Sequence, residues 1–239
     1  MKILSIGNSF STDAQRYIHK ISLLAKNPIK TVNLYIGGCS LRTHYINMLE
    51  NAKKYDFQFN GESTGLPVTI KDALISDDWD YVTLQQASHY STNRDSYVPY
   101  ITHLADYVKK YAPKAKIIIH QTWQYDEAIL AARKIAETPE KMFMALKDAY
   151  DFAAKEINAD GIIPTGEAVA QLIKNGITAP HRDGFHLSLG EGRLLASLLW
   201  YCYLTKENPE ELQIPTLDTE VSEENIKIIK KTVKEVLYK

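Results

Sequence analysis

The sequence predicts an α/β protein: a three-layer α/β/α sandwich in which a five-stranded parallel sheet is covered by helices on both faces. Five short runs of β-forming residues alternate with longer helical patterns along the chain. Residues 117–119 are three consecutive isoleucines, which is typical of a parallel strand buried on both faces. No linker, charge block or internal repeat divides the 239 residues, so we expect one domain over residues 1–239.

The strands are predicted where compact apolar runs stop at glycine or polar residues. The first run stops at Gly7 and the second at Gly37. Residues 57–70 carry two glycines and a proline, so this segment is expected to be irregular or to form a hairpin excursion. The five predicted strands are Ile3–Ile6, Thr31–Ile36, Tyr81–Leu84, Lys116–His120 and Ile162–Ile163.

The helices are predicted where apolar residues recur every three or four positions. In the first of them Tyr17, Ile21 and Leu24 share one face, and Pro113 closes a later amphipathic segment. The predicted helices are Asp13–Leu24, Leu41–Leu49, Tyr97–Tyr111, Glu127–Ala136, Glu140–Ile157, Thr165–Lys174, Ser188–Leu204 and Ser222–Leu237.

The composition limits the classes of partner. The chain carries 28 Lys and Arg against 29 Asp and Glu, a net charge of −1, with a pI of about 6.7. This balance gives no basic surface for nucleic acid or an anionic membrane, and neither partner is expected. The two cysteines, Cys39 and Cys202, form neither a disulfide framework nor a zinc pattern.

No targeting segment is visible at the start of the sequence. The chain opens with a short strand pattern rather than a signal-peptide apolar region, and Leu194–Leu204 is too short to span a bilayer. A cytoplasmic location is therefore expected. A chain from which a signal peptide had been removed would look the same, so a periplasmic or secreted location stays open.

Polar residues follow the first strand in a pattern that suits a nucleophile. In open parallel sheets, sites form beyond the carboxyl ends of the strands. Gly7-Asn8-Ser9-Phe10-Ser11 stands at that end, and a glycine before a serine lets the hydroxyl project towards the N–H groups of the next helix. The alternative is a helix cap, which Ser11 or Thr12 can supply without Ser9.

Donors for an oxyanion stand after the second and third strands. Gly37-Gly38 permits a close backbone approach, so the Gly38 N–H can face a developing negative charge, although a tight turn explains the pair equally well. Gln85 and Gln86 follow the third strand, and a glutamine amide donates hydrogen bonds without carrying charge. Alternatively, these side-chain amides form hydrogen bonds with the backbone of a loop.

Two aromatic residues, Trp123 and Tyr125, follow the fourth strand. Aromatic rings at the carboxyl end of a strand can stack on a sugar or can cover the core. The sequence leaves both interpretations open.

A carboxylate and an imidazole stand three residues apart before a strong helix. Asp183 can orient His186 and stabilise its protonated form during catalysis. A structural helix entry is one alternative, and a metal site formed by His181, Asp183 and His186 is another. The hydrolytic interpretation is favoured because a candidate nucleophile, Ser9, follows the first strand.

Together these segments resemble the SGNH (GDSL-like) hydrolases, over nearly the whole chain. The family's Gly-Asp-Ser block is Gly7-Asn8-Ser9 here, the glycine of its second block matches Gly38, and its Asp-x-x-His block is Asp183 to His186. The third block departs from the family's Gly-x-Asn-Asp, because Gln85-Gln86-Ala87-Ser88 takes its place. The residues within these blocks also resemble those of a bacterial subgroup of largely unassigned activity.

The resemblance implies a flavodoxin-like fold and a serine esterase without metal or organic cofactor. It assigns Ser9, His186 and Asp183 as a catalytic triad, and Ser9, Gly38 and Gln85, with Gln86 as the fallback, as oxyanion donors. Trp123 and Tyr125 favour a carbohydrate, so an O-acetylated sugar, small or oligomeric, is the expected substrate. Two alternatives remain: an acyl-chain esterase, thioesterase or lysophospholipase, and a non-catalytic carbohydrate-binding relative.

Overall fold

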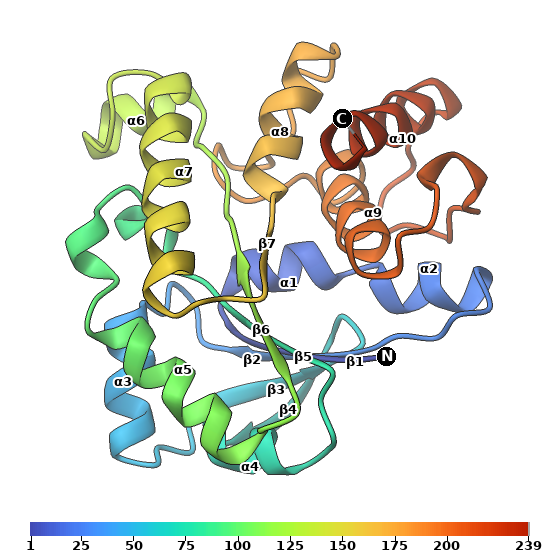
Figure 1. Ribbon diagram of the computed structural model, residues 1–239. Coiled ribbons are helices and arrows are strands. Elements are labelled where there is room, and N and C mark those ends of the chain that lie inside the picture. Colours follow the sequence, from blue (N-terminus) through green and yellow to red (C-terminus); the bar gives the residue numbers. More distant parts are fainter. Residues whose placement is uncertain (239) are drawn as a thin grey trace.

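The computed structural model describes residues 1–238, and its centre is a mixed sheet of seven strands (Figure 1). The strand order is β4-β3-β2-β1-β5-β6-β7. The strands are β1 Lys2–Gly7, β2 Lys30–Tyr35, β3 Tyr55–Phe59, β4 Glu62–Val68, β5 Tyr81–Leu84, β6 Lys116–His120 and β7 Gly161–Ile163.

The prediction of a purely parallel, five-stranded sheet is wrong in the number and direction of the strands. The five predicted strands do pair in parallel, in the order β2-β1-β5-β6-β7, but a hairpin of β3 and β4 extends the sheet antiparallel to β2. The hairpin lies in the segment 57–70, where a hairpin was one of the two expectations, but its strands were not expected in the sheet because β4 is exposed at nearly every position and contains Gly65 and Pro67. An edge strand of this kind lacks the apolar alternation by which strands are recognised.

Helices cover both faces of the sheet, as the predicted α/β/α class requires. In Figure 1, α3, α4 and α5 lie below the sheet, whereas α1, α2, α8, α9 and α10 lie above it. The helices are α1 Ser9–Gln15, α2 Ile18–Leu24, α3 Leu41–Leu49, α4 Ile70–Ile75, α5 Tyr100–Tyr111, α6 Glu127–Arg133, α7 Pro139–Glu156, α8 Thr165–Lys174, α9 Glu191–Thr205 and α10 Glu223–Leu237.

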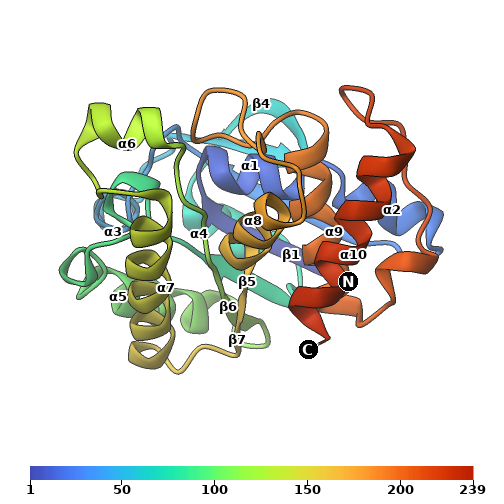
Figure 2. The ribbon, with the colours of Figure 1, turned by 90° about the horizontal axis from the view of Figure 1, so that it is seen from above.

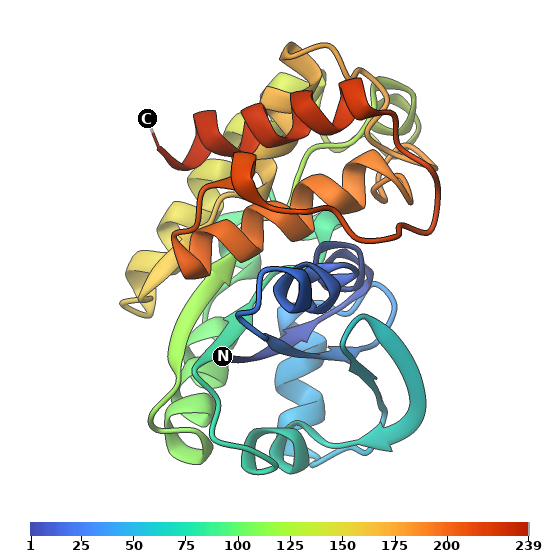
Figure 3. The ribbon, with the colours of Figure 1, turned by 90° about the vertical axis from the view of Figure 1, so that its right-hand side faces the viewer.

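The helices above the sheet are stacked on one another in successive layers. Helices α1 and α2 lie directly on the sheet, α9 packs on them, and α10 packs on α9 (Figure 3). Seen from above, α6 and α7 lie on one side of the molecule and α2 and α10 on the other (Figure 2). Helix α9 is buried nearly all round, which explains its largely apolar sequence. No helix within residues 1–238 is long and apolar enough to cross a membrane.

The first predicted helix is two helices, and it starts earlier than expected. Helix α1 begins at Ser9 rather than at Asp13, and the chain breaks between Gln15 and Ile18 before α2 begins. The cap is Asn8, whose side-chain oxygen accepts a hydrogen bond of 3.0 Å from the Phe10 N–H. Ser9 therefore stands in the first turn of a helix, with its hydroxyl free of any capping role.

Candidate active site

The nucleophile candidate lies on a tight turn between β1 and α1. Gly7 makes this turn possible, because a Cβ at this position would collide with the side chains of Ser11 and Asn33. The side chain of Asn8 is buried and turns inward, whereas the Ser9 hydroxyl faces a cavity.

The structure brings Ser9, His186 and Asp183 into one chain of hydrogen bonds. Ser9 Oγ lies 2.9 Å from His186 Nε2, across 177 residues of sequence. His186 Nδ1 lies 2.7 Å from Asp183 Oδ2, so the network assigns the Nδ1–H tautomer and leaves Nε2 to accept the serine proton.

Backbone N–H groups of its own loop fix the position of the Asp183 carboxylate. Its Oδ1 accepts hydrogen bonds from the backbone N–H groups of His186, at 2.7 Å, and Phe185, at 3.2 Å. Burial opposes the ionisation of Asp183, but the hydrogen bonds from the His186 side chain and from these two N–H groups outweigh it. The pKa of the carboxyl therefore lies below its ordinary value, and Asp183 is an anion that orients the imidazole.

A buried carboxylate fixes this loop to the nucleophile's helix. Asp13, on α1, is 1% exposed and accepts hydrogen bonds from Arg182, from Arg193 at 2.8 Å and from the backbone N–H of Leu187 at 3.1 Å. Arg182 and Leu187 flank the Asp183–His186 segment. The same short helix thus carries Ser9 and holds the loop that carries His186.

Two backbone N–H groups are free to face an oxyanion. Those of Ser9 and Gly38 donate no hydrogen bond within the described part of the chain. Gly38 has φ +62° and no neighbour around its Cβ position, so its loop is open towards the cavity. Asn8 Nδ2 donates to the Cys39 carbonyl at 3.1 Å, which ties this loop to the serine turn.

The prediction that Gln85 donates to the oxyanion is wrong for this geometry. Its side chain is 1% exposed; Nε2 donates to Asn8 Oδ1 at 2.7 Å, while Oε1 accepts from Ser11 Oγ and His120 Nδ1. The extra methylene of glutamine carries the amide under the serine turn, where it holds Asn8 in place. Gln86 does not replace it: its amide binds the backbone of Leu41 and Ala87 and both oxygens of Ser96.

Trp123 and Tyr125 do not form a sugar platform, and this prediction is also wrong. Both side chains are completely buried. Trp123 stacks on Phe10 at 4.3 Å between centroids and donates to the Phe185 carbonyl, and the Tyr125 hydroxyl lies 2.6 Å from Ser88 Oγ. They cover the core beneath the site and support Phe10 and the histidine loop.

The alternative metal site does not assemble. The buried His181 side chain turns away to Asp126, with Nδ1 and Oδ1 2.5 Å apart, while Asp183 and His186 bind each other. Within residues 1–238 no group of three or more His, Cys, Asp or Glu side chains is placed to hold a metal ion.

The Ser9 hydroxyl and the His186 ring open into a cavity of about 320 Å³. Sequence reasoning missed several of its lining residues: Tyr35, His89, Arg133 and Arg182. Arg182 could have been suspected because it directly precedes Asp183. Arg133 gave no local signal, since it stands in an ordinary helical pattern and reaches the site only through the packing of α6.

The fold is shared with known hydrolases. A protein assigned to the SGNH hydrolases from Slackia heliotrinireducens is 23% identical, with a TM-score of 0.60, over 84% of this chain and 97% of that one. An acetyl xylan esterase is 16% identical, with a TM-score of 0.51, over 84% of this chain and 98% of that one. A comparison with curated proteins finds no match. The fold is therefore that of the SGNH (GDSL-like) hydrolases.

The chain itself belongs to the family described as a domain of unknown function (DUF4886), whose family model matches residues 2–233. A DUF4886 family protein from Bacteroides uniformis ATCC 8492 is 31% identical, with a TM-score of 0.92, over 100% of this chain and 95% of that one. The resemblance read from the sequence, to SGNH-like proteins of unassigned activity, is confirmed.

Proposed function

We propose that this protein is a serine hydrolase of small carboxylic esters. The single observation that supports this most is the continuous chain from Ser9 Oγ through the imidazole of His186 to the carboxylate of Asp183, with distances of 2.9 and 2.7 Å. This is the arrangement that activates a serine, because a neutral imidazole accepts the hydroxyl proton and a fixed anion stabilises the imidazolium.

The reaction has two balanced steps. Ser9 Oγ attacks the ester carbonyl carbon while its proton moves to His186 Nε2. The tetrahedral intermediate then collapses, the ester C–O bond breaks, and the alcohol leaves with that proton. A water molecule next gives a proton to His186 and attacks the acyl-serine, which releases the carboxylic acid and restores Ser9.

The oxyanion of the intermediate is stabilised by the N–H groups of Ser9 and Gly38. Loss of one such donor typically raises the barrier by about 3–4 kcal/mol. The described geometry offers these two backbone donors without help from Gln85, so the oxyanion site depends on how accurately the Gly38 loop is placed.

The cavity supports a small acyl group, with acetyl preferred. Arg133, Arg182 and His89 contribute to its wall, and its volume is only about 320 Å³. This composition speaks against the acyl-chain alternative. The Ser9–His186 hydrogen bond speaks against the non-catalytic alternative, which required a separation too large for one. The acetyl xylan esterase shares the fold, but the burial of Trp123 and Tyr125 removes the residues on which the sugar prediction relied.

A panel of p-nitrophenyl esters from acetate to octanoate tests this proposal. We expect kcat/KM to fall from acetate to longer chains, and Ser9→Ala to lose hydrolysis by at least about 10⁴-fold with nearly unchanged Tm. Ser22→Ala, a buried helix serine outside the site, is the matched control and should keep the activity. Rates that rise steadily to octanoate would favour the acyl-chain alternative, and full activity in Ser9→Ala would reject the triad.

A further inference from the structure

Arg133 is the cation of the active-site cavity that has no carboxylate of its own. The residues lining this cavity include two arginines and no aspartate or glutamate. Arg182 is neutralised by Asp13, at 3.0 Å. Arg133, in contrast, makes no ion pair with any residue of the described chain. The net charge facing a bound substrate is therefore positive.

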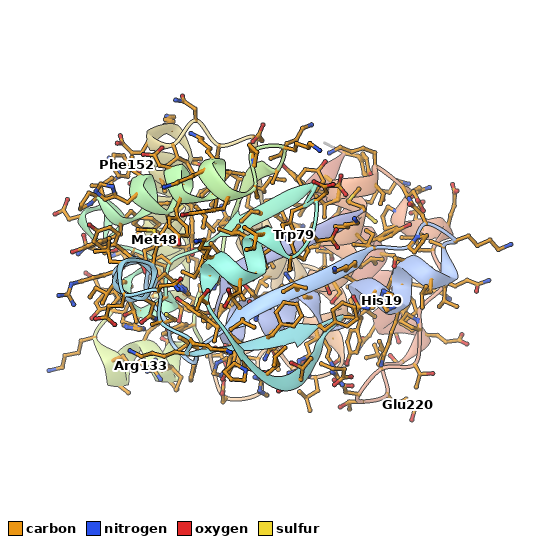
Figure 4. All side chains as sticks on the ribbon, turned by 90° about the horizontal axis from the view of Figure 1, so that it is seen from below. His19, Met48, Trp79, Arg133, Phe152 and Glu220 are labelled. Carbon is orange, nitrogen blue, oxygen red and sulfur yellow. The ribbon has the colours of Figure 1, made fainter. Side chains whose placement is uncertain are left out.

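The guanidinium of Arg133 is positioned rather than free in solvent. It lies over the Phe185 ring, 4.3 Å from the centroid, and 5.5 Å from the centroid of Tyr125. Stacking of this kind holds the guanidinium plane while its N–H groups remain available to bind an anion in a bidentate manner. Arg133 is exposed at the end of α6, and Figure 4 shows it at the periphery of the molecule.

Helix α6 is fixed relative to the catalytic loop, so this placement is not accidental. The Asp126 N–H donates to the Gly184 carbonyl at 2.8 Å, and the Asp126 carboxylate binds His181. Ile129 packs closely against Gly184. Three contacts therefore tie the start of α6 to the segment that carries Asp183 and His186.

The alcohol side of the ester is the side that Arg133 faces. The leaving oxygen must lie beside His186 Nε2, because that atom returns the proton to it. The Phe185 ring, on which Arg133 is stacked, lies 4.2 Å from the His186 ring between centroids. A group on the leaving alcohol is thus the part of the substrate that comes nearest to the guanidinium.

A second donor stands close by. His89 lines the same cavity, and its pKa lies below the ordinary value because of burial and, next, the positive charge of Arg133. A neutral imidazole there can donate one N–H to an anion without adding charge. Asp183, the acidic side chain of the neighbouring loop, is turned towards His186.

We propose that the substrate is an ester whose alcohol carries an anionic group, a carboxylate or a phosphate, and that Arg133 binds this group. The inference rests on the proposed esterase function and names the substrate class of the same site. It requires no further chemistry, since the anion is bound and released unchanged with the alcohol.

Matched acetate esters test the inference. We expect kcat/KM for 4-acetoxybenzoate to exceed that for its neutral methyl ester by about tenfold or more at low salt, and the ratio to shrink in 0.5 M NaCl. 4-Acetoxyphenyl phosphate separates the two sources of charge: a larger preference for it indicates a phosphate site, a smaller one a carboxylate site.

Variants assign the effect to one side chain. Arg133→Met should abolish the preference for the charged ester, mainly through KM, whereas Arg133→Lys should restore part of it. Lys134→Met removes the same charge from the next residue, which does not line the cavity, and should keep the preference. Equal rates for charged and neutral esters in the wild type, or equal losses in both methionine variants, would overturn the inference.

Binding of the product alcohol separates this inference from the proposed function. If neither ester is hydrolysed, the esterase proposal fails, but the anion site is still measurable by calorimetry with 4-hydroxybenzoate and its methyl ester on Ser9→Ala. Tighter binding of the acid that disappears in Ser9→Ala/Arg133→Met supports the site. Equal affinity for the acid and its methyl ester rejects it.

Discussion

At the residue scale, Asn8 connects the parts of the candidate site that the chain supplies separately. Its Oδ1 caps α1 through the Phe10 N–H and accepts from Gln85, while its Nδ2 donates to the Cys39 carbonyl. One amide thus joins the ends of three strands. The Gly-Asp-Ser block of the SGNH hydrolases has an aspartate at this position. An aspartate has no side-chain N–H to donate to the Cys39 carbonyl.

Asn8→Asp should lower both stability and kcat. A carboxylate oxygen would face the Cys39 carbonyl in place of a donor, and an unsatisfied buried group costs about 1–3 kcal/mol. The Gly38 loop would shift with Cys39, so kcat should fall more than KM rises. Urea unfolding and ester kinetics measure the two effects. Asn51→Asp, the same change at an exposed turn, is the control, and a neutral result at Asn8 would refute this role.

Gln85→Ala distinguishes a supporting residue from an oxyanion donor. Removal of the buried amide leaves Ser11, His120 and Asn8 each short of a partner, so we expect a loss of about 2 kcal/mol in the free energy of unfolding together with a lower kcat. A direct oxyanion donor would change kcat while leaving the unfolding curve in place, and that outcome would restore the prediction made from the sequence.

At the element scale, α1 combines two tasks. It carries Ser9 on its first turn, and through Asp13 it holds the histidine loop and α9. A carboxylate so deeply buried is stable only with its partners, and breaking such a pair by removing one member costs about 3–5 kcal/mol.

Asp13→Asn should therefore be strongly destabilising although it preserves the size of the side chain. Arg182 and Arg193 would lose their buried counter-charge, and the loop that presents His186 would lose its anchor. Chemical denaturation should show a loss of several kcal/mol, about 3 or more. Asp218→Asn provides the comparison, because Asp218 also pairs with Arg193 but is 20% exposed; equal losses in both variants would contradict the argument.

How far the sequence predicts these elements depends on where each side chain's partners lie. The five parallel strands and helix Thr165–Lys174 could be recognised because their patterns are local. The orientation of Trp123 and Gln85 could not, since both point to partners supplied by distant segments, Phe185 and Asn8. Helix α4 was not predicted because it has only six residues, and β4 was expected only as part of a possible hairpin because its exposure removes the periodicity of a strand.

At the scale of the whole molecule, two buried histidines link folding to pH. His44 and His120 are completely buried, and burial lowers the pKa of each to about 3. His44 Nδ1 lies 2.9 Å from the Tyr55 hydroxyl, and His120 binds Gln85. Both are neutral in the folded protein over the physiological range.

Stability should therefore fall as the pH falls below about 6.5, the ordinary histidine value. Between that pH and about 3 the unfolded chain binds protons that the folded chain does not, so each histidine removes up to about 1.4 kcal/mol per pH unit. Urea unfolding from pH 7.5 to 4.5 measures the slope. His103→Asn, at an exposed site, should leave it unchanged, and a flat profile would show that these rings are protonated in the folded state.

The pairing of Asp13 with Arg182 and Arg193 has a consequence for the protein as it is made. Ser9 and Asp13 leave the ribosome before their partners, which follow about 170 residues later. Until the segment from Arg182 to Arg193 has been translated, Asp13 lacks its arginine partners and Ser9 lacks the imidazole beside it, so the arrangement around α1 is incomplete. The proposed hydrolytic site can therefore assemble only in molecules whose synthesis has passed Arg193.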